Sequence, residues 1–459
     1  MKSFLQKHKY KILALTVSPA ILTYSTTYYL FPDLRNNQYQ LLKALNRTCR
    51  VVYAGARMAY IYQKNDDIPI EKKHEKASLI LRDTFIKNAG LYLKFAQLLS
   101  SLDVIVPQEY RNNFETLCHD CPQSSFESVK KTIESQLDKP LHEIFSYFNE
   151  KPLKSASIAQ VHEAILKENG QKVAVKVQHD WLSQSSKGDI KLVQMYVNIG
   201  EKFFPEFKFK WFSDEIEQIL KQELNFYQEI DNGEKARELL KNKKNLYIPQ
   251  YYFDYCSEKV ITMEYIDGFP IMDVNLLRKQ NFDLQKIAFI ISDAFSQMIF
   301  NNGFVHSDPH QGNLLIRKVS NNFKSEDQVV LLDHGLYKQL TPTFRLAYSK
   351  LWKAIIEQDI SQMEKSSQEL GVQEEYSKLF VSMITSRVFD DITDKKKDVK
   401  ERLISPKTQQ ERDKIVTNAA KHHKNIIKVL QEMNRYFFNI KKQYQLIQKQ
   451  KNIDHQYFY

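Results

Sequence analysis

Glycine is scarce in this chain, with only 11 residues among 459, so long flexible linkers are few. Cysteine is scarcer still: four residues at this length exclude a disulfide-stapled scaffold. The C-x-x-C pair formed by Cys118 and Cys121 has no second pair at zinc-site spacing and no thioredoxin-like strand before it. We interpret it as two thiols near a helix end rather than as a zinc or redox site.

The sequence also lacks the alternation of basic and aromatic residues that is typical of a nucleic-acid-binding platform, and it has no internal repeat. Its net charge of +11 is concentrated at the two ends. Residues 1–32 carry four lysines and no acid, and residues 395–459 carry 16 basic against 6 acidic side chains. Residues 33–394 are nearly balanced, at 46 against 49. This distribution favours an anionic membrane or lipid as partner and argues against a nucleic acid.

Residues 12–31 carry no charge and are long enough to span a bilayer, although their Ser, Thr and Tyr content makes the span weak. A secretory signal, a mitochondrial targeting segment that also anchors, and a packed helix all fit this stretch. The acid-free, basic start favours the first two, and the lack of a clean small-residue cleavage site disfavours the secretory signal. We therefore expect residues 1–35 to deliver the chain to mitochondria and to hold it in the inner membrane, with a cleaved presequence as the alternative.

Apolar side chains recur at helical spacing near the other end of the chain, at Ile426, Leu430, Met433, Phe437, Ile440, Tyr444 and Ile447. They predict a helix docked on the body with a basic, solvated face. The alternative is a helix that lies on an anionic membrane.

The periodicity changes along the middle of the chain. Residues 37–150 are helical in pattern, and a hairpin of strands 159–166 and 172–178 follows, joined at Asn169-Gly170. Beyond it we predict helices at 183–203 and 212–241, strands at 247–252 and 259–265, further helices, and a second hairpin from 313–316 and 329–332.

Residues of a phosphoryl-transfer site occur along this pattern in the order that kinases use. Strand 172–178 carries Lys176, which is either solvent-exposed or aimed into a cleft, and helix 212–241 carries Glu223 and Glu229, either of which can pair with it. A loop of the form H-x-D-x-x-x-x-N runs from His306 through Asp308 to Asn313, and Asp333-His334-Gly335 follows an apolar strand. Asp308 suits a catalytic base, and the oxygens of Asn313 and Asp333 suit Mg²⁺.

Other interpretations of the same residues remain open. Asp308, Asn313 and Asp333 can serve as turn or cap residues. His306, Asp308 and His310 can converge on a metal, as in a hydrolase. The hydrolase interpretation gives no role to Lys176 or Glu229.

The sequence resembles the UbiB family of atypical kinases, the aarF-domain-containing proteins, from about residue 75 to 360. Lys94-Phe95-Ala96-Gln97 resembles the family's K-x-G-Q motif, and residues 155–162 resemble its alanine-rich nucleotide loop. Glu223-Leu224-Asn225 resembles its E-x-D motif, and residues 303–310 resemble its catalytic loop. Asp333-His334-Gly335 is similar to the D-H-G of the mitochondrial branch.

The resemblance implies an α+β, two-lobed protein-kinase-like fold with a helical N-terminal extension, and ATP and Mg²⁺ as cofactors. The implied parts are an anchor (1–35), a helical extension (36–150), an N-lobe (151–268), a C-lobe (269–394) and a basic helical region (395–459). The implied roles are an ion pair (Lys176 and Glu229), a base (Asp308), magnesium ligands (Asn313 and Asp333), nucleotide contacts (Ser155, Ser157, Glu264 and Tyr265) and gating of the site (Lys94, Gln97 and Glu223).

Three departures from the family pattern bear on nucleotide behaviour: Ala96 replaces a glycine, Asn225 replaces an aspartate, and Lys154-Ser155-Ala156-Ser157 replaces an alanine run. The core lysine, base and metal residues are intact. The resemblance therefore implies an ATP-dependent kinase or ATPase in mitochondrial lipid or isoprenoid-quinone homeostasis, with a protein or lipid phosphate acceptor that the sequence does not name. The rival is a nucleotide-binding pseudokinase that acts as a scaffold or lipid chaperone.

Overall fold

The computed structural model describes residues 38–64, 67–100, 106–115, 117, 123–180, 182, 188–191, 217–219, 221–308, 310–321 and 324–404. Segment 12–31, the Cys118–Cys121 pair and stretch 426–447 lie outside these residues. Within the described ranges, no helix combines the length and apolarity needed to span a bilayer. Tertiary contacts divide the chain into unit 1 (Met1–Glu143, Phe148–His162 and Lys176–Leu224) and unit 2 (Ile144–Tyr147, Glu163–Val175 and Asn225–Tyr459).

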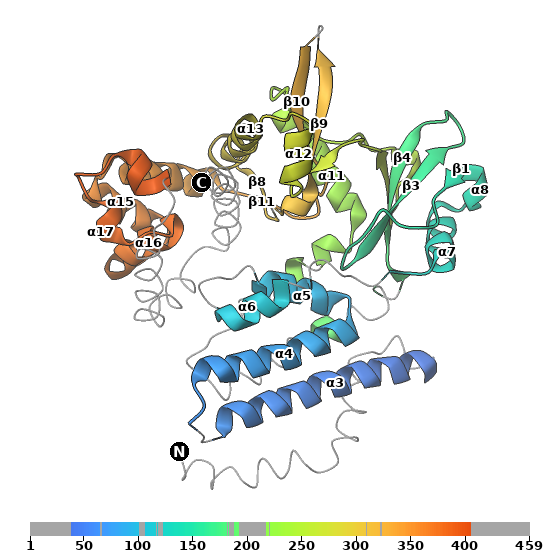
Figure 1. Cartoon of the computed structure of the whole chain (residues 1–459), viewed down its shortest axis with the longest axis horizontal. Helices are drawn as coiled ribbons and strands as arrows, with labels where there is room; N and C mark the ends of the chain where they lie inside the picture. Colours follow the sequence, from blue (N-terminus) through green and yellow to red (C-terminus); the bar gives the residue numbers. More distant parts are fainter. Residues whose placement is uncertain are drawn as a thin grey trace. The chain divides into compact units, whose positions relative to one another are not determined.

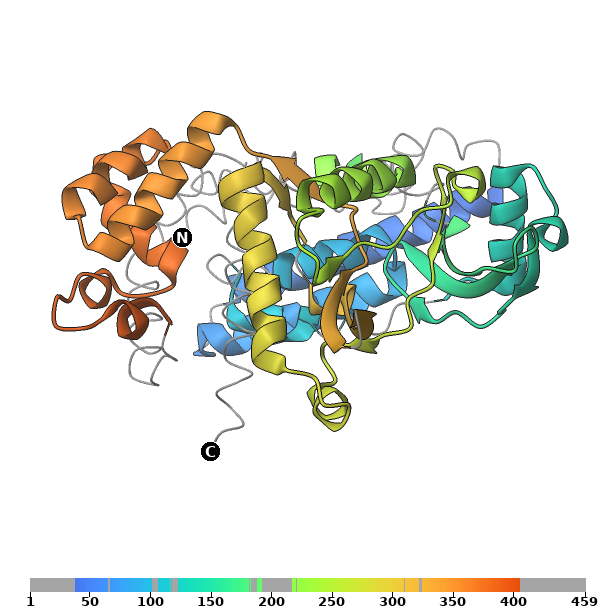
Figure 2. The ribbon, with the colours of Figure 1, turned by 90° about the horizontal axis from the view of Figure 1, so that it is seen from above.

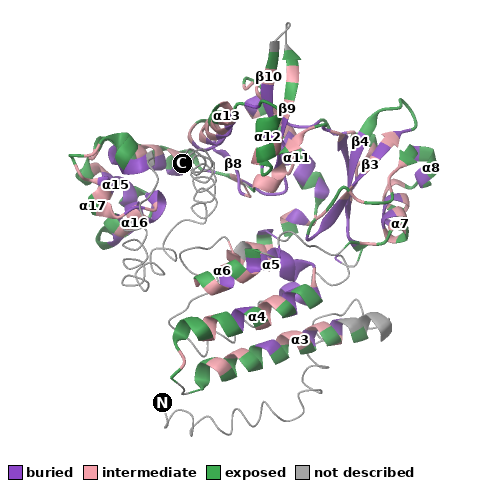
Figure 3. Cartoon of the chain, in the orientation of Figure 1, coloured by how far each residue is buried: buried purple, intermediate pink, exposed green. Residues whose placement is uncertain are grey.

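The described part of unit 1 begins with four helices that pack side by side (Figure 1): α3 (Gln38–Gln63), α4 (Ile70–Asn88), α5 (Leu91–Ser100) and α6 (Gln108–Glu115). Buried residues recur along α3 and α4 between exposed ones, as expected for amphipathic helices (Figure 3). The shared core is largely aromatic and aliphatic, and comprises Ala77, Phe85, Tyr92, Leu93, Ala96, Tyr110, Phe114 and Leu117. The helices predicted for this part of the chain are confirmed.

The predicted helical region ends earlier than expected. Helix α7 (Phe126–Leu137) starts at Ser125, whose side chain accepts the Ser128 N–H, and the short α8 (Leu141–Ile144) follows. The chain then enters strand β1 (Phe145–Phe148), which lies inside the range predicted to be helical. The prediction is wrong for these four residues because three of them are aromatic, which favours a strand, and because pairing with a neighbouring strand overrides local pattern.

The first sheet has the order β1-β3-β4-β6, with β2 paired to β3. Its other strands are β2 (Lys154–Ser155), β3 (Ala159–Leu166), β4 (Lys172–Gln178) and β6 (Val260–Glu264). The predicted hairpin of β3 and β4 is confirmed, and its turn places Gly170 at a φ of 70°. Every residue of β4 after Lys172 is buried. Lys176 is therefore not the solvent-exposed lysine that its sequence pattern also allowed.

The predicted helix 212–241 is broken. Residues 217–219 and 221–223 are helical, but α11 starts anew at Phe226 and runs to Leu240. The break falls at Asn225, whose backbone is extended and whose side-chain oxygen accepts the Tyr227 N–H at 3.1 Å. Asparagine is a preferred N-cap because its short side chain satisfies an otherwise unpaired helix N–H. Glu223 thus precedes the start of α11 in the sequence, and Glu229 follows it.

Unit 2 holds a four-stranded sheet of order β5-β10-β9-β7 and a two-stranded pair, β11-β8. The strands are β5 (Leu246–Tyr247), β7 (Phe269–Pro270), β8 (Phe304–His306), β9 (Leu314–Asn321), β10 (Lys324–Leu331) and β11 (Tyr337–Gln339). The second predicted hairpin is confirmed as β9 and β10, which are longer than expected. The predicted strand 247–252 is mostly wrong, because the chain leaves the sheet after Tyr247.

Helices cover this sheet and continue beyond it. Helix α13 (Leu284–Ser296), the yellow helix of Figure 2, packs on it through isoleucines that share one core with Ile316, Val329 and Leu331. The remaining helices and helical turns are η3 (Phe253–Tyr255), α12 (Val274–Lys279), η4 (Gln297–Asn302), η5 (Gln311–Asn313), α14 (Pro342–Glu357), α15 (Ile360–Glu369), η6 (Glu374–Tyr376), α16 (Ser377–Thr385), α17 (Phe389–Ile392) and η7 (Lys400–Ile404).

Candidate active site

Two loops of unit 2 are bracketed by the same two antiparallel ladders. In one ladder His306 of β8 pairs with Tyr337 of β11, and in the other Leu314 of β9 pairs with Leu331 of β10. Residues 307–313 connect β8 to β9, and residues 332–336 connect β10 to β11, so the two loops share both boundaries. We call residues 307–313, which carry the predicted base Asp308, the catalytic loop, and residues 332–336, which carry the predicted metal ligand Asp333, the metal loop. The ladders bring together two motifs that are separated in sequence.

Main-chain hydrogen bonds join the two loops at both ends. The Ser307 N–H donates to the Leu336 carbonyl at 2.8 Å, and the Leu332 N–H donates to the Asn313 carbonyl at 3.0 Å. The backbone at Asn313 is therefore attached to the residue that precedes Asp333. Because these bonds involve only the main chain, they position the side chains of both loops without using them.

His306 links the loops a third time and is itself almost fully buried. Its Nδ1 accepts the Asp308 N–H at 3.1 Å, so Nε2 carries the ring hydrogen and donates to the Asp333 carbonyl at 2.8 Å. Both ring nitrogens are thus engaged within the chain, and the alternative of a His306, Asp308 and His310 metal cluster is wrong for His306. The sequence singled His306 out only as part of a motif or as a metal ligand.

The metal loop offers hard oxygen ligands. Asp333 is half-buried, and its Oδ1 accepts the Gly335 N–H at 2.9 Å, which orients the carboxylate. Asn313 lies at the other end of the joined loops with its amide half-buried. Across the described residues, no group of three or more His, Cys, Asp or Glu is placed to hold a metal ion. One carboxylate and one amide oxygen suit Mg²⁺, which takes oxygen ligands and completes its shell with phosphates and water.

His334, the middle residue of the metal loop, points into the core. Its Nε2–H donates to the Leu331 carbonyl at 3.2 Å, and Nδ1 lies 3.0 Å from the Tyr337 hydroxyl. The His334 and Tyr337 rings stack, with centroids 5.8 Å apart. Burial lowers the pKa of His334 to about 3, with a further lowering from the neighbouring His306. His334 is therefore a neutral, buried residue that anchors the loop rather than an acid or a base.

Helix α11 supplies two further residues of unit 2. Glu229 lies in its first turn and is 4% exposed. Asn232, one turn later, donates its side-chain N–H to the His334 carbonyl at 3.0 Å. The helix that carries the predicted ion-pair glutamate is thus attached directly to the metal loop. The sequence did not assign this role to Asn232.

The predicted nucleotide loop, residues 155–162, runs in unit 1 from the last residue of β2 into the first half of β3; Ser155 is half-buried and Ser157 is buried. His179, which directly follows β4, holds the main chain of this loop. Its N–H donates to the Ile158 carbonyl at 3.0 Å and its Nε2–H to the Ala156 carbonyl at 3.1 Å. Burial lowers the pKa of His179, so the ring is neutral and Nδ1 can accept the Ser124 hydroxyl at 2.7 Å.

Lys176 lies on β4, also in unit 1, and is 9% exposed. Its strand neighbour Gln178 donates to the Leu224 carbonyl at 3.1 Å, next to the break that precedes α11. Lys176 and Glu223 belong to unit 1, whereas Glu229, Asp308, Asn313 and Asp333 belong to unit 2. The pairing of Lys176 with Glu229 stays a prediction.

Glu264 and Tyr265, at the end of β6, are partly committed to contacts within unit 2. The Glu264 carboxylate accepts the Tyr247 hydroxyl at 2.5 Å, and Arg317 lies 3.7 Å from it. The Tyr265 N–H donates to the Lys172 carbonyl at 3.4 Å. The Glu264 N–H donates to the Gln250 carbonyl at 2.8 Å, so the Glu264 carboxylate and the N–H groups of both residues are already engaged within unit 2.

Two of the three predicted gating residues form an ion pair. The Lys94 ammonium on α5 lies 2.6 Å from the Glu223 carboxylate, and their side chains are 11% and 5% exposed. Gln97 is half-buried one turn beyond Lys94. Ala96, which replaces the family glycine, is fully buried in the core between α4 and α6. The alanine methyl group therefore contributes to packing at this position.

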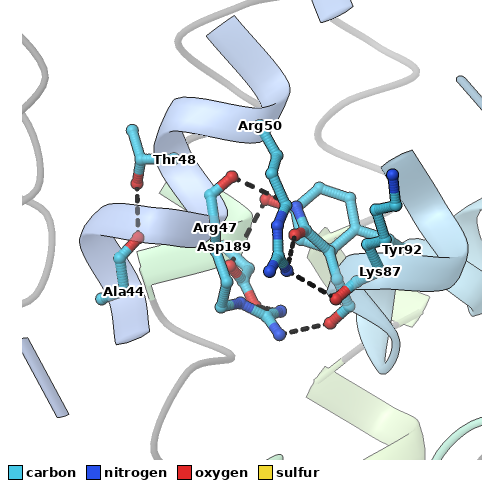
Figure 4. Close-up of polar contacts among 8 residues, drawn as sticks. Ala44, Arg47, Thr48, Arg50, Lys87, Tyr92 and Asp189 are labelled. Atoms are coloured by element: carbon cyan, nitrogen blue, oxygen red, sulfur yellow. Dashed lines mark hydrogen bonds and ion pairs between the residues drawn. The ribbon is translucent and has the colours of Figure 1, made fainter. Parts of the chain in front are cut away.

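A polar cluster that the sequence did not reveal holds the start of α5 (Figure 4). Arg47 of α3 pairs with Asp189 at 2.6 Å, donates to the Asn88 carbonyl, and lies over the Tyr92 ring at 5.4 Å. The Tyr92 hydroxyl donates to the same carboxylate at 3.4 Å. Because Arg47 and Asp189 are 142 positions apart, no local pattern could show this pair. The cluster fixes the turn that leads into the Lys94 helix.

Comparison with known proteins identifies the family. The ABC1 atypical kinase-like domain matches residues 116–367, over half of the chain. AarF domain-containing protein kinase 1 of Mus musculus is 38% identical over 319 residues, which are 70% of this chain and 60% of that protein. AarF domain-containing kinase 1 of Drosophila melanogaster is 36% identical over 374 residues, 82% of this chain and 70% of that protein.

A probable serine/threonine-protein kinase, abkD of Dictyostelium discoideum, is 31% identical over 444 residues, 96% of this chain and 62% of that protein. The chain thus spans between 60% and 70% of the length of these three relatives. Among solved structures, the complex of Rv3197 with erythromycin from Mycobacterium tuberculosis has a TM-score of 0.48 at 20% identity, covering 83% of this chain and 96% of that one. The chain belongs to the ABC1/AarF atypical kinase family, and its mixed helical and sheet fold, with a helical amino-terminal part, is kinase-like.

Proposed function

We propose that the chain is an atypical kinase or ATPase that uses Mg-ATP. The observation that carries the proposal is the junction of the catalytic and metal loops, where His306 holds the main chains of Asp308 and Asp333 together. A base and a metal ligand that act on the same phosphoryl group must be held in fixed relation, because catalysis of this transfer rests on positioning and electrostatics.

The residues divide the work as follows. Asp308 accepts the proton of the attacking hydroxyl or water, and Asn313 and Asp333 hold Mg²⁺, which, when bound, neutralises charge on the phosphates. Lys176 holds the α- and β-phosphates and is oriented by Glu229. Ser155 and Ser157 lie along the phosphates, and Glu264 and Tyr265 lie at the adenine. Lys94, Gln97 and Glu223 restrict entry to the site. The lobes 151–268 and 269–394 and the extension 36–150 are the parts that carry these roles.

Nucleotide binding is the first test. Mg-ATP should raise the thermal midpoint of the wild-type chain, because a ligand that binds only the folded state stabilises it, by about 2.7 kcal/mol at a hundred times its Kd. Asp333→Asn should lose most of this shift. Asp254→Asn, an exposed carboxylate of η3, is the matched control. Equal shifts in Asp333→Asn and wild type, or binding unchanged by EDTA, would contradict the assignment of the metal.

Turnover separates the enzyme from the rival function, a nucleotide-binding pseudokinase that acts as a scaffold or lipid chaperone. A base that acts only in the chemical step contributes little to binding. Asp308→Asn should therefore keep the Mg-ATP shift and lose roughly 10²- to 10⁴-fold in ATP turnover. Full restoration of function by this variant in cells that lack the protein would favour the scaffold.

We further propose that this activity serves lipid or isoprenoid-quinone homeostasis in mitochondria, at the inner membrane, with a protein or lipid as phosphate acceptor. The acid-free basic start and the uncharged residues 12–31 support an amino-terminal anchor with its lysines on the matrix side. Carbonate extraction combined with protease protection of mitoplasts tests this. A chain released by carbonate, or protected from protease once the outer membrane is opened, would contradict the proposed topology.

A further inference from the structure

Gly233 stands in the middle of α11, where glycine is less favourable than alanine. A Cβ built on Gly233 would lie 2.2 Å from the Tyr251 Oη, 2.7 Å from its Cε2 and 2.9 Å from its Cζ. Non-bonded atoms at such distances repel strongly, since favourable contact begins near 3.5 Å. The Tyr251 ring therefore packs directly against the helix backbone at Gly233. A residue with a Cβ fits at position 233 only if the ring or the helix moves.

The Tyr251 ring is held from several sides and is 3% exposed. The Arg237 guanidinium lies over the ring, 5.5 Å from its centroid, and is itself attached to the Ile248 and Pro249 carbonyls. The main chain of Tyr251 bridges to Met263 on β6. Turning the ring away from α11 would break these contacts, so a side chain at Gly233 would have to displace the helix.

Displacement of α11 would reach the proposed site directly. Gly233 follows Asn232, which donates to the His334 carbonyl in the metal loop, and lies four residues after Glu229. Burial raises the pKa of the Tyr251 hydroxyl, and the charges of Glu229 and Asp333 raise it further, as expected for a ring close to both carboxylates. One contact between helix and ring thus bears on Glu229 and Asp333 together.

We infer that Gly233 and Tyr251 form a positioning pair. The contact between the helix backbone and the tyrosine ring sets the position of α11 and, through Asn232, the conformation of the metal loop. The role of Glu229 in this inference rests on the proposed function. The link from Gly233 to the metal loop does not, because it is carried by the Gly233–Tyr251 fit and the Asn232–His334 hydrogen bond.

A double-mutant cycle tests the fit. Gly233→Ala should lower the thermal midpoint by roughly 5 °C, as an overpacked core site does. Tyr251→Leu opens space beside α11, so Gly233→Ala should cost little or nothing when added to it. Gly55→Ala is the matched control, because Gly55 is also inside a helix, α3, and a Cβ there meets nothing within 4 Å. Strictly additive midpoints, or a Gly233→Ala variant that behaves like Gly55→Ala, would overturn the inference.

Hydrogen exchange tests the positioning without nucleotide. In Gly233→Ala the amides of residues 332–336 should exchange about tenfold faster, because the Asn232 bond to His334 is strained, and Tyr251→Leu should restore slow exchange in the double variant. Unchanged exchange in the metal loop of Gly233→Ala would mean that the contact only packs the core, and would overturn the positioning role. If the wild-type chain in the same samples does not bind Mg-ATP, the proposed function is refuted. The exchange rates of residues 332–336 then still test whether Gly233 and Tyr251 position the metal loop.

Discussion

His306 donates its Nε2–H to the Asp333 carbonyl at 2.8 Å while its Nδ1 accepts the Asp308 N–H at 3.1 Å. A single buried imidazole therefore holds the main chains of the proposed base and the proposed metal ligand. Neither bond uses a carboxylate oxygen. Histidine suits this position because its neutral ring has one donor and one acceptor on opposite sides.

Replacing His306 by Phe should therefore weaken both the fold and the chemistry. The change keeps an aromatic ring but leaves a partly buried N–H and a partly buried carbonyl without their partner, at a cost of up to about 1–3 kcal/mol each. Loss of the fixed relation between the loops should lower ATP turnover at least tenfold at temperatures where the variant is folded. His142→Phe, an exposed histidine of α8, is the control. Wild-type turnover in His306→Phe would show that the link is dispensable.

The Lys94–Glu223 pair gives a second prediction. Because both side chains are largely buried, removal of one partner leaves a desolvated charge, and Lys94→Met should cost about 3–5 kcal/mol of unfolding free energy. The double variant Lys94→Met with Glu223→Leu should recover most of that loss. Denaturant unfolding measures both values.

An exposed pair provides the comparison for this cycle. Lys353 and Glu357 lie 3.8 Å apart on α14 with side chains 73% and 57% exposed, so Lys353→Met should change stability by less than about 1 kcal/mol. If Lys94→Met lowered the unfolding free energy no more than Lys353→Met does, the buried pair would contribute no more to stability than the exposed pair.

The sequence predicted the parts of this molecule that depend on local pattern. The hairpin of β3 and β4 and the order of the motifs that carry Lys176, Asp308 and Asp333 follow from alternation and spacing over a few residues. The reliance on local pattern also explains an error. Helical periodicity continues on both sides of Asn225, so the sequence predicted one helix over 212–241 where an N-cap starts a new one.

Long-range relationships could not be predicted. The pairing of β8 with β11, the His306 link and the fit of Tyr251 against Gly233 each join segments whose encounter depends on the whole fold. The sequence contained one signal that was not used: a glycine in the interior of a strongly helical stretch, Gly233, usually has a packing reason.

The N-cap at Asn225 gives a third prediction. Asn225→Ala should lower the unfolding free energy by about 1 kcal/mol, because the Tyr227 N–H loses its acceptor. Asn225→Asp, which restores the family residue, should be at least as stable as wild type, since aspartate caps equally well and its charge favours a helix start. Denaturant unfolding of the three proteins measures this order. Equal loss in both variants would mean that Asn225 acts through some contact other than the cap.

The buried His334 makes stability depend on pH in a defined window. Its pKa is lowered by burial from 6.5 to about 3, so between these values the unfolded chain binds a proton that the folded chain does not. The stabilisation is fully present above pH 6.5 and is lost as pH falls toward 3, at up to about 1.4 kcal/mol per pH unit for this one group. The same sign applies to His162 and His179, whose pKa values burial also lowers.

His334→Phe should remove this contribution. The variant loses the hydrogen bonds to Leu331 and Tyr337, so at pH 8 it should be about 1–3 kcal/mol less stable than wild type. Between pH 6 and 4, however, its unfolding free energy should fall less steeply than that of wild type, by up to about 1.4 kcal/mol per pH unit, because one proton-binding site of the unfolded chain is gone. The two unfolding curves should therefore converge as the solution is acidified. Parallel curves for His334→Phe and wild type would show that folding does not lower the pKa of His334.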